Sequence, residues 1–159
     1  MHAPEAEMKY VKQGAFIDRS PVMHNDFVII GPDADQAGLR RSETTEAALH
    51  RLMATESRFV SRGDDSGTHK KELSLWGEVK PSGRWYIQAG QGMGAVIKMA
   101  DEMRAYTLTD RGTYIAFADK IELTIVHEDT PPLFNPYHVM AVNPDKHPHV
   151  QYDLVKRYI

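Results

Sequence analysis

Two short stretches of this chain combine arginine, glycine and hydroxyl residues where a helix is predicted to begin. The first runs through Ser61 and Arg62, two aspartates, and the turn Ser66-Gly67-Thr68. Backbone N–H groups in the first turn of a helix lack helical partners, and with the positive end of the helix dipole they bind oxyanions. The guanidinium of Arg62 adds a planar fork of donors that suits a tetrahedral oxyanion. The chemistry that this pattern indicates is anion binding.

The second stretch, Leu108–Phe117, repeats the same combination at another predicted helix start. Its candidate anion-binding residues are Thr109, Arg111, Gly112 and Thr113. We expect Thr109 to cap this helix, while the neighbouring aspartate favours the helix dipole or holds the arginine in place.

Each stretch, taken alone, also has a purely structural interpretation. In the first, Asp65 or Ser66 caps the helix and Arg62 pairs with Asp64. In the second, the aspartate and the arginine form an ordinary capping arrangement. As isolated patterns, both stretches favour capping over binding.

A glycine cluster offers a different function, dinucleotide binding. Gly90–Ala95 fits the spacing G-x-G-x-x-A between a predicted strand and a predicted helix, and Asp110 follows about twenty residues later. However, Asp110 lies at a helix start instead of a strand end, and little chain follows for a second mononucleotide-binding half. The glycines are better explained by close packing between a helix and a strand.

The sequence gives little support to catalysis or to metal binding. There is no cysteine, no G-x-S-x-G nucleophile motif, and no acid at ligand spacing from His147-Pro148-His149. We therefore predict neither a catalytic residue, nor a metal site, nor a cofactor.

The totals fit a single globular domain with a core. The chain has 159 residues, 42% of them hydrophobic and 26% charged. A net charge of -3 at pH 7 gives no general attraction to nucleic acid, so an anion site must be local. No apolar run is long enough to span a bilayer, and Met-His-Ala-Pro-Glu at the N-terminus is not a secretory signal.

Short predicted strands alternate with predicted helices. The strands are 22–30, 59–61, 85–90, 105–108, 122–127 and 138–142, and the helices are 44–57, 66–75, 92–104, 109–117 and 152–159. We expect Lys70, Lys71 and Glu72 on the solvent side of the second helix. This alternation predicts an α/β fold, a mixed sheet flanked by helices, in which ligands collect outside the carboxyl ends of strands.

Four blocks of the chain resemble one known family. They are "NDFVIIGP", "FVSRGDDSGTHKKELSLW", "GQGMGAVIKMADEMRAYTLTDRGTYIAF" and "LFNPYHVMAVNPDKHP". They are similar to the tungstate-binding components of tungstate ABC transporters, which have the type II periplasmic-binding-protein fold. The similarity runs from about His2 to the last residue.

The resemblance implies that an oxoanion, tungstate or molybdate, is held between two lobes and passed to an ABC transporter permease, without catalysis. Ser61, Arg62 and Ser66-Gly67-Thr68 match the anion motif of the second lobe, and Thr109–Tyr114 matches a block near the cleft. It also implies a periplasmic or extracellular location. The same architecture occurs in effector-binding domains of transcription regulators, which is the alternative function.

The chain lacks the threonine- and serine-rich anion loop with which members of the family begin, and its last helix is cut. It therefore resembles a partial module of residues 1–159, with a second lobe at 32–130 and first-lobe remnants at 1–31 and 131–159. The crossings between lobes are expected near 27–32 and 130–141. Apolar strand edges near Val28, Ile30, Val139 and Ala141 would then be exposed, and such edges recruit another chain into a homo-oligomer.

Overall fold

The computed structural model describes residues 4–159 and divides into two compact units. The larger unit is Asp26–Phe134, and the smaller unit combines Met1–Asn25 with Asn135–Ile159. Met1–Ala3, where the sequence shows no secretory signal and where the family resemblance begins, lie outside the described residues. Within residues 4–159, no helix has the length and apolar character needed to cross a bilayer.

The larger unit contains most of the secondary structure. Its elements are the second part of β1 (Phe16–Gly31), η1 (Leu39–Arg41), α2 (Thr45–Thr55), β2 (Phe59–Ser61), α3 (Gly67–Trp76), β3 (Tyr86–Gln88), α4 (Met93–Met103), β4 (Thr107–Asp110), α5 (Arg111–Phe117), η2 (Ala118–Lys120) and β5 (Thr124–His127). Strands and helices alternate as the sequence predicts.

The strands of the larger unit form two sheets, one with the order β4-β1-β5 and one of β2 and β3, which a single bridge joins into a mixed arrangement. β2 pairs in parallel with β3, and a parallel bridge between Phe59 and Tyr106 joins β2 to the residue before β4. β1 runs antiparallel to both of its neighbours, β4 and β5. The carboxyl ends of β3, β2 and β4 therefore lie at one edge of the sheet, and α3, α4 and α5 begin there. The predicted mixed sheet flanked by helices is confirmed.

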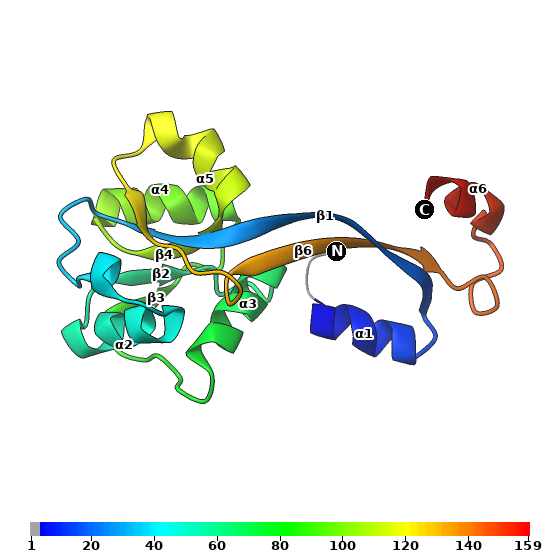
Figure 1. Ribbon diagram of the computed structural model, residues 1–159, viewed down its shortest axis with the longest axis horizontal. Helices are drawn as coiled ribbons and strands as arrows, with labels where there is room; N and C mark the ends of the chain where they lie inside the picture. The colour runs from blue at the N-terminus through cyan, green and yellow to red at the C-terminus, as the bar shows by residue number, and fades with distance from the viewer. Residues whose placement is uncertain (1–3) are drawn as a thin grey trace. The chain divides into compact units, whose positions relative to one another are not determined.

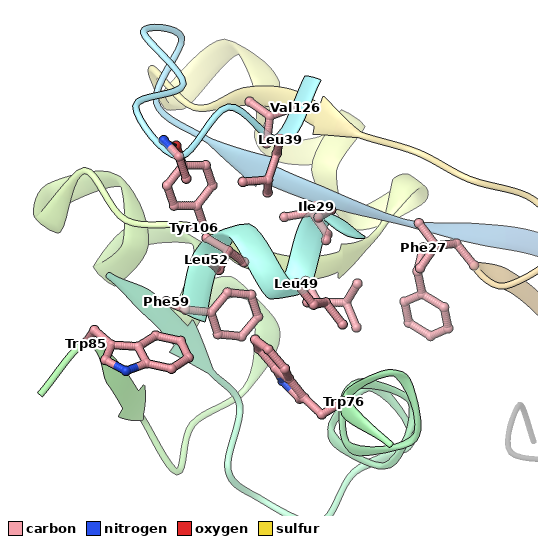
Figure 2. Packing of buried hydrophobic residues seen from close by; sticks show 14 residues of the cluster. Phe27, Ile29, Leu39, Leu49, Leu52, Phe59, Trp76, Trp85, Tyr106 and Val126 are labelled. Atoms are coloured by element: carbon pink, nitrogen blue, oxygen red, sulfur yellow. Dashed lines mark hydrogen bonds between the residues drawn. The ribbon is translucent and has the colours of Figure 1, made fainter. Parts of the chain in front are cut away.

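Alternating residues of β1 divide the core into two layers. Phe27 and Ile29 pack with α2 and the two tryptophans, whereas Val28 and Ile30 pack against α4. Figure 1 shows α4 and α5 on one side of these strands and α2 on the other. The first layer is mostly aromatic and aliphatic side chains pointing toward one another (Figure 2).

The smaller unit contains α1 (Pro4–Lys12), the first part of β1, β6 (Phe134–Val142) after its first residue, and α6 (Tyr152–Tyr158). β6 pairs with β1. The carboxylate of Glu7 is fully buried, where it accepts from Arg19 Nε at 3.0 Å and lies 2.9 Å from His138 Nδ1. This ion pair attaches α1 to the strand pair.

The predicted exposed strand edges are not present at three of the four positions. Val28 and Ile30 have no exposed surface, because β1 is paired on both sides and covered by α4. Ala141 is 1% exposed, and Val139 is half-buried. The expectation of a homo-oligomer rested on these exposed edges, so the structure gives it no support at those three positions.

Candidate anion-binding site

The connection from β2 to α3 has a tightly bent backbone. Gly63 has φ +58°, and a Cβ on it would lie 2.8 Å from Cβ of Gln88 at the end of β3. Asp65 also has positive φ, 58°. The Arg62 carbonyl accepts the N–H of Gly90 at 2.8 Å. These contacts hold the connection against the next strand.

The start of α3 keeps two amide donors available. Ser66 is the N-cap, and its hydroxyl accepts from the N–H of His69 at 3.3 Å. Within residues 4–159, the N–H groups of Gly67 and Thr68 have no hydrogen-bond partner, and neither does the Thr68 hydroxyl, although Thr68 is only 5% exposed. The positive end of a ten-residue helix therefore presents unused donors.

Arg62 contributes a buried donor without an acceptor. One terminal nitrogen pairs with the carboxylate of Asp64, but Nε is buried and has no partner within the described residues. A buried donor left unpaired costs about 1–3 kcal/mol, and more when it is charged. Arg62 Nε can therefore donate a hydrogen bond to an oxygen atom of a ligand.

The two aspartates do not occupy the donors of the helix start. The carboxylate of Asp64 accepts a hydrogen bond from the Ser66 N–H at 3.2 Å and also forms the ion pair with Arg62. Burial raises the pKa of Asp64, but the hydrogen bonds from Ser66 and Arg62 outweigh burial and lower it to about 2. Asp65 points to solvent, where its carboxylate lies 3.1 Å from Lys70 Nζ. Within residues 4–159, neither carboxylate accepts a hydrogen bond from the N–H groups of Gly67 and Thr68.

The hydroxyl of Ser61 is engaged elsewhere. Ser61 is 1% exposed and donates to Oε2 of Glu72 at 2.6 Å. The prediction that Glu72 faces solvent is wrong, since its residue is 3% exposed. Thr68, Glu72 and Trp76 are four residues apart and all buried on one side of α3. This spacing is the sequence signal that was missed.

The second predicted stretch lies at the same sheet edge, but its groups are paired. Asp110, not Thr109, is the N-cap of α5: its carboxylate accepts the N–H of Thr113 at 2.8 Å and also its hydroxyl. Thr109 is fully buried, and its hydroxyl donates to the Asp110 carbonyl at 3.2 Å. Asp110 caps the helix better than Thr109 because an ionised carboxylate also interacts with the helix dipole. Gly112 is exposed.

Arg111 is held between two carboxylates. Its Nε donates to Asp26 Oδ1 at 2.8 Å, and Nη2 donates to Asp26 Oδ2 at 2.6 Å and to Glu128. The hydrogen bond between Arg111 and Asp26 lowers the pKa of Asp26 and raises the pKa of Arg111. The guanidinium is therefore largely neutralised by acids of the larger unit, unlike that of Arg62.

The glycine cluster starts α4 at the same edge. A Cβ on Gly94 would lie 2.9 Å from Cζ of Phe117, so this glycine permits close packing between two helices, α4 and α5, instead of between a helix and a strand. Gly92 is an N-cap without a side-chain hydrogen bond, and the N–H groups of Met93 and Gly94 have no partner within residues 4–159. These two amides are candidate donors that were not predicted from the sequence.

No metal centre occurs in the part of the chain that the structure describes. Residues 4–159 contain no group of three or more His, Asp or Glu side chains that could hold a metal ion. The rings of His147 and His149 contact each other edge to face, with centroids 6.0 Å apart.

Comparison with protein families gives a match along the whole chain. A sequence model of the PBP superfamily domain matches residues 1–159. The tungstate-binding protein TupA of Peptoclostridium acidaminophilum is 44% identical over 162 aligned residues, which cover 99% of this chain and 57% of that protein. TupA of Campylobacter jejuni is 42% identical, with 100% of this chain and 61% of that protein covered. The chain thus spans little more than half the length of these relatives.

Solved structures give the same relationship. The crystal structure of the tungstate ABC transporter from Geobacter sulfurreducens superposes with a TM-score of 0.88 at 53% identity, over 99% of this chain and 68% of that one. The tungstate-binding protein TupA from Desulfovibrio alaskensis gives a TM-score of 0.83 at 45% identity, over 99% and 66%.

Proposed function

We propose that this chain, which belongs to the PBP superfamily domain family, is the anion-holding part of a solute-binding protein. Its ligand is a tetrahedral oxoanion, tungstate or molybdate, which it delivers to an ABC importer. The role is capture and release, with no chemical change in the ligand. Relatives of 42% to 44% identity that carry the name tungstate-binding protein support this ligand class.

The proposal rests on two observations within residues 4–159: Arg62 Nε is buried without a partner, and α3, which starts five residues later in the chain, has free amides in its first turn. An oxoanion oxygen would supply the acceptor that Nε lacks, and a second oxygen would receive the N–H groups of Gly67 and Thr68. Hydrogen bonds between a charged donor and an anion are about twice as strong as neutral ones. The Thr68 hydroxyl is a further donor in the same turn.

The contribution of Thr109, Arg111, Gly112 and Thr113 stays a prediction. Arg111 is already paired with Asp26 and Glu128, so we assign the principal charged contact to Arg62. For Ser61, whose hydroxyl donates to Glu72, we propose an indirect role.

Delivery to a permease and a periplasmic or extracellular location belong to the same proposal. They rest on relatives of which this chain covers 57% to 68%. Solute-binding proteins of this kind hold the ligand in a cleft and release it at a membrane complex.

Calorimetric titration of the full-length gene product tests the proposal. We expect tungstate and molybdate to bind, since they have nearly the same size and charge, and sulfate to bind more weakly because it is smaller. NAD is the control for a nucleotide-binding function. Binding of NAD with no binding of any oxoanion would reject the proposal.

A further inference from the structure

A buried carboxyl group lies in α3, one turn after the residues of the candidate anion site, and is hydrogen-bonded to Ser61. Glu72 is on the second turn of α3 and is 3% exposed. Its Oε2 is 2.6 Å from the hydroxyl of Ser61, and its Oε1 accepts from the Tyr86 hydroxyl at 2.6 Å and from Trp76 Nε1 at 3.2 Å. Ser61 immediately precedes Arg62, so this network connects the end of β2, β3 and α3.

We propose that Glu72 is a positioning residue that couples binding of the oxoanion to uptake of one proton from solvent. This inference rests on the proposed function. Glu72 does not contact the anion: it acts through its charge and through Ser61. In the acid form its O–H donates to the Ser61 hydroxyl, and in the ionised form the Ser61 O–H donates to the carboxylate.

The coupling follows from charge in a buried place. An ionised Glu72 lies four residues after Thr68, one turn deeper in the helix whose first turn receives the anion. A buried negative charge there repels a dianion, because little water screens the two charges. Protonation of Glu72 removes the repulsion while Tyr86 and Trp76 still find an acceptor. The dianion and the acid form of Glu72 therefore stabilise each other, as linkage requires.

The surroundings of Glu72 favour its acid form more than water does for an exposed glutamate. Burial raises the pKa of Glu72, and the hydrogen bonds from Ser61, Tyr86 and Trp76 and the charge of His69 oppose this rise. Ser61 faces it from β2, Tyr86 from β3, and Trp76 and His69 from its own helix. α2 and β4 also pack on α3, and no side chain from them is hydrogen-bonded to Glu72 within the described residues.

The proposal predicts the pH dependence of affinity. Binding of a dianion raises the pKa of Glu72 further, so the affinity for tungstate falls as pH rises through the pKa of Glu72 in the free protein. We expect the dissociation constant to increase by at least about fivefold as pH rises from below the pKa of Glu72 in the free protein to above its higher pKa in the complex. A factor of about five is the lower end of typical coupling between two sites.

The test is calorimetric titration of the full-length gene product with sodium tungstate from about pH 5 to about pH 9, in buffers of different ionisation enthalpy that report proton uptake. Wild type should take up protons on binding. Glu72→Gln should bind with a nearly constant affinity and take up none beyond what tungstate itself contributes, because the amide donates to Ser61 permanently and accepts from Tyr86. His69→Gln should keep the proton uptake.

A second variant distinguishes titration of Glu72 from a merely structural role. Tyr86→Phe removes a hydrogen bond that lowers the pKa of Glu72, so the midpoint of the pH profile should move to higher pH. This variant also decides the question if Glu72→Gln does not fold.

The outcomes distinguish a failure of the inference about Glu72 from a failure of the proposed function. If wild type binds tungstate and Glu72→Gln has the same pH profile and proton uptake, or if only His69→Gln removes the uptake, the inference about Glu72 is overturned and the proposed function stands. An unchanged or lower midpoint in Tyr86→Phe also overturns it. If wild type binds no oxoanion at any pH, the proposed function itself has failed.

Discussion

At the scale of single residues, the two arginines of the sheet edge differ in what surrounds them. Arg111 is shared by Asp26 and Glu128. Within residues 4–159, Arg62 has one acidic partner and a buried Nε without an acceptor. An incoming anion would therefore gain more from Arg62 than from Arg111. The two arginines are matched controls for each other.

Arg62→Ala should weaken tungstate binding by roughly ten- to a hundredfold, since charge-assisted hydrogen bonds contribute about 1.5–3 kcal/mol. Arg62→Lys should restore only part of the affinity, because a point charge lacks the planar fork. Calorimetric titration of the full-length gene product measures both. Arg111→Ala is the control: we expect it to lower stability more than affinity. If Arg62→Ala binds as tightly as wild type, the assignment of Arg62 is wrong.

Asp64 should stabilise the fold in a pH-dependent way. Its pKa in the folded state is lowered to about 2, below the value of about 4 in unfolded chains. Its contribution is therefore present above about pH 4 and is lost as pH falls through about 2. Asp64→Asn should cost about 1–2 kcal/mol near neutral pH and much less near pH 2.5, as measured by urea unfolding.

The neighbouring Asp65→Asn is the control for that experiment, because the Asp65 side chain is 85% exposed and pairs only with Lys70. We expect it to change stability little at any pH. Equal losses for the two variants, or a loss for Asp64→Asn that does not shrink on acidification, would contradict the role given to Asp64.

Most residue types at the site and their local partners could be predicted from the sequence, but partners from other strands could not. The cap at Ser66 and the pairing of Arg62 with Asp64 follow from local spacing. The burial of Glu72 depends on Tyr86 and Ser61, which two other strands bring to it. Contacts of this kind depend on the sheet order, which local patterns do not contain.

At the scale of elements, the connection after β2 requires glycine at position 63 for two reasons, its φ of +58° and the approach of Gln88. Gly63→Ala should destabilise the protein by roughly 1–3 kcal/mol from backbone strain, with a further loss from the contact. Gly90→Ala is the matched control, since Gly90 has φ +62° but open space around its Cβ position. It should cost less in thermal or urea unfolding. Equal costs would show that the approach of β3 is unimportant.

The lengths of elements were less predictable than their order. The helices after β2 and β3 begin within one residue of their predicted starts, because Ser66 and Gly92 are the N-cap residues there. In contrast, β1 begins at Phe16 instead of Val22. Its first part is exposed or half-buried and has no continuous apolar run, and its pairing with β6 is a long-range contact that local patterns do not contain. α1 was not predicted, although Pro4 at its start and two glutamates in its first turn are helix-start signals.

At the scale of the whole molecule, the sequence resemblance predicted the fold, and physical patterns alone would have left several α/β arrangements open. The mixed sheet follows from β1 running antiparallel to its neighbours, a fact that depends on long-range pairing. The unit boundaries at Asn25 and Phe134 lie a few residues outside the predicted 32–130 lobe. The last residues of β1 pair with β4 and β5 and are covered by α4, which explains the wrong prediction for Val28 and Ile30.

The central claim is that the oxoanion binds where Arg62 meets the start of α3. Anomalous diffraction at a tungsten absorption edge, from crystals of the full-length gene product grown with tungstate, locates the metal atom directly. We predict one strong peak within hydrogen-bonding reach, through its oxygens, of Arg62 Nε and of the N–H groups of Gly67 and Thr68. A fully occupied peak away from these groups, with Arg62 Nε still unpaired, would contradict the account.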